Sequence, residues 1–224
     1  MHKVLTRDTW LATASHNALT SAAGGRMPKG FRCNWWINRE IRVFWQEGIP
    51  RQTAEVITDA CRERIADCHL PLFDFKLFGP HWSVDEQIVQ SLRGNQIDDE
   101  KFNDLCLRER WRDEELGGRQ HGDIVITRHP LEAGSVHWGS TGIKNGVILF
   151  ALHGNRPRNH SFLWNVAKHE MGHLLGAAWH CDERTVEGYQ YEPHCNMHYS
   201  CAGEKLCLKC KDFIRQWWSA LGVI

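Results

Sequence analysis

The chain has 224 residues, with 27 Lys or Arg and 27 Asp or Glu, so its formal net charge is +0. Hydrophobic residues make up 42% and charged residues 24%, a composition that is typical of one folded domain and excludes a disordered chain. A neutral chain without an apolar run of about 20 residues gives no reason to expect nucleic acid or a membrane as partner.

The predicted elements alternate between strands and helices. Residues 1–30 are expected to form a helical arm with a glycine-rich joint, and residues 31–224 a single domain. Periodicity predicts strands at 41–45, 73–78, 123–128 and 147–152, and helices at 52–68, 83–92, 98–116 and 212–221. A further helix is expected from a cap at Asn159 or Ser161 to about Leu175, and a turn at 139–144. This order predicts an α/β fold with one mixed sheet.

The helix predicted before Leu175 contains the sequence HEMGH. His169 and His173 are four residues apart, so both imidazoles leave one helix face, as two ligands of one Zn²⁺ would. Glu170 lies beside that face, where it can accept a proton from a water molecule. Gly176 suits the left-handed residue that ends a helix, and His180 can return a third nitrogen. Three imidazoles leave one coordination position open, which is typical of a catalytic zinc.

The alternative for this helix is a buried element with two hydrogen-bonded core histidines. Its other residues are largely apolar, as at Phe162, Leu163, Val166 and Leu174. Burying two imidazoles and a carboxylate among them without a partner would be unfavourable. The motif therefore favours a metal site.

Five of the nine cysteines lie in the loop-rich segment after this helix. The start of the sequence lacks the apolar stretch of a secretion signal, which predicts a cytoplasmic protein with reduced thiols or metal ligands. Cys207 and Cys210 have the spacing of a zinc knuckle, with Cys181, Cys195 and Cys201 within reach. Ordinary reduced thiols are the alternative. Three lysines could offset the charge of four thiolates: Lys205, Lys209 and Lys211.

Together these motifs resemble those of the archaemetzincin (archaelysin) family of metalloproteases, within the metzincins. The family pattern is HExxHxxGxxHC, then CxM, then CxxC, and this chain has HEMGHLLGAAWHC, CNM and CLKC in that order. The Cys directly after the third His points to this family. The resemblance implies a metzincin-like domain over 31–224, with a twisted mixed sheet and a long active-site helix. It implies a catalytic motif at 169–180 and a loop-rich, zinc-stapled cysteine cluster at 181–210.

The resemblance also implies a role for each matching residue. It implies a catalytic zinc on His169, His173 and His180, with Glu170 as the general base. It implies a structural zinc on four thiolates: Cys181, Cys195, Cys207 and Cys210. Met197 corresponds to the Met-turn, an apolar floor below the imidazoles, for which a gap-filling core methionine is the alternative. The strand at 147–152 resembles the metzincin edge strand that pairs with an extended substrate.

The chain departs from the family pattern next to the third histidine. Three residues separate Gly176 from His180 where the family has two, and Trp179 stands in the usual ligand position. His194 and His198 are the rival third ligands. The sequence at 197–199 is also similar to the MHY of astacins, which makes Tyr199 a candidate transition-state or fifth ligand.

The sequence therefore predicts a zinc-dependent metallopeptidase that hydrolyses peptide bonds with a zinc-activated water and a Glu base. Its expected cofactors are two Zn²⁺, one catalytic and one structural, and its expected partner is a peptide or protein substrate. The alternative is a non-catalytic, zinc-stabilised protein-interaction module, which would not require Glu170. A nucleic-acid-binding zinc ribbon fits poorly with zero net charge and a single CxxC.

Overall fold

A computed structural model of the chain describes residues 35–111, 121–131, 139–142, 146–152, 160–177, 180–181, 194–198 and 203–224, with backbone only at 107–111 and 142. The predicted arm at 1–30 lies outside the described residues, as do Trp179, Tyr199 and Cys201. Within the described residues, no helix combines the length and the apolar character that a bilayer crossing requires.

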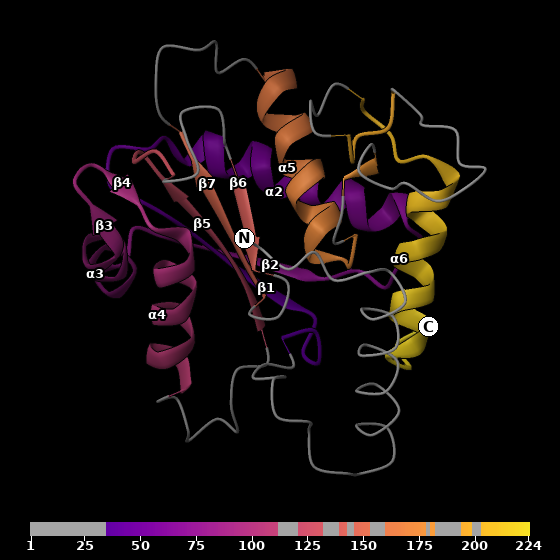
Figure 1. Cartoon of the computed structure of the whole chain (residues 1–224), viewed down its shortest axis with the longest axis horizontal. Helices are drawn as coiled ribbons and strands as arrows, with labels where there is room; N and C mark the ends of the chain where they lie inside the picture. Colours follow the sequence, from indigo (N-terminus) through magenta and orange to yellow (C-terminus); the bar gives the residue numbers. More distant parts are fainter. Residues whose placement is uncertain are drawn as a thin grey trace, which may run out of the picture.

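The centre of the domain is a five-stranded sheet with the strand order β2-β1-β5-β7-β6 (Figure 1). Its strands are β1 (Glu40–Trp45), β2 (Asp74–Gly79), β5 (His121–Thr127), β6 (Gly139–Gly142) and β7 (Val147–Ala151). All neighbouring pairs are parallel except β6 with β7, which is antiparallel. The predicted mixed sheet is therefore confirmed.

Helices cover both faces of this sheet (Figure 1). One face carries α2 (Arg51–Asp67), α5 (His160–Leu174) and α6 (Leu208–Ala220), and the other carries α3 (Trp82–Ser91) and α4 (Asp99–Trp111). A short hairpin of β3 (Leu92–Arg93) and β4 (Gln96–Ile97) joins α3 to α4.

Strands β5 and β7 contribute side chains to two hydrophobic cores, one on each face of the sheet. Ile124 and Ile148 pair in register and join the core under α2, α5 and α6. Val125 and Leu149, the next pair, join the core under α3 and α4. Because successive side chains point to opposite faces and both faces are buried, β7 is apolar throughout, as VILFA.

Two sequence expectations about this region are wrong. Gly139–Gly142 forms strand β6 and not a turn, and β7 lies between β5 and β6, so it is not the edge strand. The sequence GSTG has no apolar alternation, because its strand conformation comes from pairing with β7. The edge strand beside α5 is therefore β6.

The C-terminal segment is anchored to the end of α5. Gly176 has a φ of 113°, a left-handed conformation that lets the chain turn away from the helix. The indole Nε1 of Trp218, on α6, donates to the carbonyl oxygen of Leu175 at 2.9 Å. Helix α6 begins at Leu208, earlier than predicted, because Cys207 is its N-cap and the cysteine knuckle forms its first turn.

Candidate functional site

Three histidines converge at the C-terminal end of α5. The rings of His169 and His173, one helical turn apart, have centroids 4.7 Å apart. After the turn at Gly176, His180 brings its ring to 5.2 Å from that of His169 and 5.1 Å from that of His173. One nitrogen of each ring lies within 4.8 Å of the other two, a spacing that could hold a metal ion.

Hydrogen bonds fix the tautomers of the two helical histidines. Nδ1 of His169 lies 2.6 Å from the carbonyl oxygen of Asn196, and Nδ1 of His173 lies 2.6 Å from that of Ala177. A carbonyl can only accept, so each Nδ1 carries the proton, and each Nε2 of a neutral ring is unprotonated and presents a lone pair.

These lone pairs face each other. The two Nε2 atoms are 3.0 Å apart, and neither can donate while both rings are neutral. Two lone pairs at this distance repel unless a cation lies between them. Tetrahedral zinc ligands at 2.0–2.1 Å have nitrogens about 3.3 Å apart, close to this separation. The donors therefore fit a zinc ion, and their carbonyl partners are the supporting contacts usual for metal-binding histidines.

The structure groups His180, and not the rival residues, with the helical histidines. His194 and His198 both belong to the described residues, and neither joins the three-histidine group. The longer loop after Gly176 therefore still returns an imidazole to α5.

Glu170 points its carboxylate at β6. The hydroxyl of Thr141 donates to its Oε2 at 2.7 Å. A Cβ at Gly139 would lie 2.6 Å from Oε1, so only glycine leaves room for the carboxylate there. Burial raises the pKa of Glu170 to about 7, and the hydrogen bond from Thr141 opposes that rise. Such a carboxyl group can both accept and return a proton near neutral pH.

Met197 packs against α5. It is fully buried, and its Sδ lies so close to Gly172 that any side chain at 172 would overlap it. Its carbonyl oxygen accepts the backbone N–H of Cys181 at 2.6 Å. Met197 thus joins α5 to the segment that carries His180 and Cys181.

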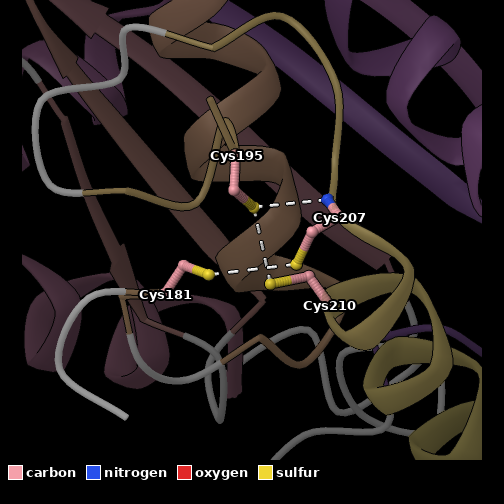
Figure 2. Close-up of side chains that lie close together, drawn as sticks. All are labelled: Cys181, Cys195, Cys207 and Cys210. Carbon is pink, nitrogen blue, oxygen red and sulfur yellow. Dashed lines mark hydrogen bonds between the residues drawn. The ribbon is translucent and has the colours of Figure 1, made fainter. Parts of the chain in front are cut away.

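Four cysteines meet next to this segment, as Figure 2 shows. The Sγ atoms of Cys181 and Cys207 are 3.8 Å apart, and those of Cys195 and Cys210 are 3.6 Å apart. Ligands at 2.3 Å from a tetrahedral zinc have sulfurs about 3.8 Å apart. The backbone N–H of Cys207 also donates to Sγ of Cys195 at 3.4 Å. The group therefore fits a closed four-thiolate metal site.

The thiols influence one another's ionisation. Hydrogen bonds from Cys207 and Cys210 lower the pKa of Cys195, whereas burial and the neighbouring thiols raise the pKa of Cys181. A thiolate at Cys195 would accept hydrogen bonds from the S–H groups around it. A divalent metal replaces those protons and lets all four sulfurs ionise.

Three contributors to the site were missed from the sequence: Gly139, Thr141 and Asn196. Gly139 and Thr141 lie on β6 and contact Glu170, which comes 29 positions after Thr141 in the sequence. Asn196 holds His169 through a backbone carbonyl, which any residue type would supply. None of them belongs to a local motif, so spacing carries no signal for them.

Comparisons with known proteins bear on the fold. No family model and no curated protein matches the sequence. Solved structures do match. A zinc-dependent peptidase from Methanocorpusculum labreanum (strain Z) has a TM-score of 0.50 at 18% identity, covering 78% of this chain and 99% of that chain. Archaemetzincin from Methanopyrus kandleri has a TM-score of 0.52 at 13% identity, covering 86% and 98%. The predicted archaemetzincin-like fold is confirmed.

Proposed function

We propose that this protein is a zinc-dependent metallopeptidase, a divergent relative of the archaemetzincins whose fold it shares. The observation that carries the proposal is the convergence of three imidazoles, with the Nε2 atoms of His169 and His173 only 3.0 Å apart. Glu170, on the same helix, supports a catalytic role for this metal, because a purely structural metal site would not require a carboxylate beside it. The names of the two similar structures agree with this activity.

His169, His173 and His180 would hold the catalytic zinc. When bound there, zinc supplies Lewis acidity toward a peptide carbonyl and lowers the pKa of water. Glu170 accepts the proton of the attacking water on its carboxylate and then delivers it to the nitrogen of the leaving amine. Thr141 holds the carboxylate through its 2.7 Å hydrogen bond, and Gly139 leaves the space for it.

An extended peptide fits the edge of β6. Among the described residues, β6 pairs with β7 on one side only, so the backbone groups of its other edge can bind a substrate strand. Because Thr141 and Gly139 contact Glu170, a peptide added at this edge would lie beside the carboxylate. This assigns substrate pairing to β6, in place of β7.

The four-thiolate group would hold a second, structural zinc. Its ligands come from the segment after His180, the segment before Met197 and the start of α6. A metal there would tie together segments that have little regular structure of their own. The proposal therefore needs two zinc ions per chain, with different roles.

Peptide hydrolysis by the purified protein tests the activity. The parent, Glu170→Gln and a matched control, Glu86→Gln on the exposed side of α3, are incubated with a mixed peptide library and products are identified by mass spectrometry. We expect the parent and the control to cleave peptides and Glu170→Gln to lose at least about 10²-fold in rate with its zinc retained. Equal hydrolysis by Glu170→Gln, or none by the zinc-loaded parent, would contradict the proposal.

A further inference from the structure

A fully buried arginine links the two candidate metal sites. Arg64, on α2, is 0% exposed. Its Nε donates to the carbonyl oxygen of Lys168 at 2.9 Å, and its Nη2 donates to the side-chain oxygen of Asn196. Its Nη1 lies 3.4 Å from the carboxylate of Asp67. A buried guanidinium is unfavourable unless such partners satisfy it, so its orientation is fixed by them.

The side chain of Asn196 is held by three hydrogen bonds. Its Nδ2 donates to the carbonyl oxygens of Asn165 at 3.1 Å and Gly203 at 2.8 Å, while its Oδ1 accepts from Arg64. Its backbone carbonyl is the group that accepts the Nδ1 proton of His169 at 2.6 Å. Any shift of Asn196 therefore moves the acceptor that sets the ring of His169.

Two partners of Arg64 are connected to His169. Lys168 precedes His169 on α5, and Asn196 faces its ring from the opposite segment. Arg64 thus acts as a clamp between the helix that carries the imidazole and the loop that orients it. Supporting hydrogen bonds of this kind set both the direction and the basicity of a metal-binding imidazole.

The same guanidinium lies near the thiol cluster. Burial lowers the pKa of Arg64, and nearby negative charge opposes this, most from Cys68 and Asp67 and less from Cys195 and Cys210. Its acidic neighbour Asp67 is shared, because Nζ of Lys168 lies 3.2 Å from the same carboxylate oxygen. The negative charge of a metal-loaded thiolate cluster would therefore help to keep this cation in place.

We propose that Arg64 is a positioning residue that couples the two metal sites, holding Asn196 against α5 so that the ring of His169 keeps its direction. Cys195 immediately precedes Asn196, so the clamp joins a ligand of the thiolate site to the acceptor that orients a ligand of the imidazole site. The effect of this coupling on a bound zinc rests on the proposed function. The hydrogen bonds that Asn196 accepts from Arg64 and from His169 do not depend on it.

The test compares three variants with the parent. Arg64→Lys keeps the charge and loses the forked donor, Arg64→Met removes both, and Arg62→Met is the matched control. Arg62 lies on the same helix, half-exposed, with its own ion pair to Asp59 at 2.8 Å. Two quantities are measured: the solvent-exchange rate of the His169 Nδ1 proton by NMR, and the rate at which a chelator removes zinc from the three-histidine site.

Arg64→Lys is the decisive variant because it preserves the charge. We expect its Nδ1 proton to exchange at least about 10-fold faster than in the parent. We expect its three-histidine zinc affinity to fall about 10- to 100-fold, while the thiolate-bound zinc stays. Arg64→Met should show the same faster exchange of the His169 Nδ1 proton, and it should weaken zinc binding at the thiolate site as well. Arg62→Met should match the parent.

Two results would overturn the inference. One is Arg64→Lys with parent-like proton exchange and parent-like zinc release; the other is Arg64→Met that unfolds while Arg64→Lys is unchanged, which would make Arg64 structural only. A parent that binds no zinc at the three histidines, or hydrolyses no peptide, contradicts the proposed function instead. Proton exchange at His169 still decides the role of Arg64 in that case.

Discussion

The space left by Gly139 gives the sharpest test of how Glu170 is positioned. In Gly139→Ala the new Cβ would lie 2.6 Å from Oε1, and its three nearest atoms all belong to Glu170. The nearest of them, Cγ, would be only 2.4 Å from the new Cβ. Non-bonded carbon atoms normally approach to about 3.5 Å, so the Glu170 side chain would have to retreat by about 1.1 Å. That movement also stretches the 2.7 Å hydrogen bond from Thr141.

A displacement of this size has a known order of effect on catalysis. Misplacing a catalytic group by about 1 Å costs about 10²-fold in rate, or about 2.7 kcal/mol of transition-state stabilisation. We expect the loss in kcat, with KM little changed, because the substrate edge of β6 keeps its backbone. Both metals should remain bound, since the methyl group meets the carboxylate and not the imidazoles.

The assay measures peptide hydrolysis and zinc content together, with Ser140→Ala as the matched control. Ser140 is the next residue of β6, and its hydroxyl bonds to Asp99 at 2.6 Å, away from Glu170. The control should lose less than about 3-fold in kcat, because the hydrogen bond that it removes goes to the Asp99 carboxylate and not to Glu170. If Gly139→Ala hydrolysed peptides as fast as Ser140→Ala at equal zinc content, the position of the Glu170 carboxylate would not limit the reaction.

Three further changes probe the donors around the site. Thr141→Val keeps the side-chain shape and removes the donor to Glu170, so kcat should fall about 10-fold with both zinc ions retained; a fall in zinc content instead would show a structural effect. His180→Ala should weaken the three-histidine zinc by more than about 100-fold and leave the thiolate zinc, as titration with a chelator would reveal; loss of the thiolate zinc alone would refute the assignment. Cys207→Ser keeps an adequate N-cap for α6 and removes a thiolate. One zinc should therefore be lost and Tm should fall by about 10 °C or more, whereas an unchanged melting curve would exclude a structural metal there.

The sequence was informative where the chemistry is local. His169 and His173 meet because the helix places positions four apart on one face, and Cys207 and Cys210 meet within one turn. The convergence of His180 could also be expected, since Gly176 ends the helix and returns the chain. The apolar run at 147–152 predicted a strand, which is β7, but its burial on both faces was not predicted.

The rest depends on contacts between distant segments. Strand β6 has no periodic apolar pattern, so neither its edge position nor the link from Thr141 to Glu170 could be read from spacing. Arg64 appears in the sequence as an ordinary helical arginine, and only the packing of α2 on α5 buries it against Asn196. The Asn196 carbonyl that orients His169 carries no side-chain signal at all. Local motifs thus predicted the donors, and tertiary packing decided what holds them.

X-ray diffraction from crystals of the zinc-loaded protein, recorded at the zinc absorption edge, tests the two proposed zinc sites most directly. We expect two anomalous peaks per chain, one among the Nε2 atoms of His169, His173 and His180 and one among the four Sγ atoms of the cysteine cluster. A single peak within the cysteines, with none between the three imidazoles, would contradict the central claim that this fold carries a catalytic metal beside Glu170.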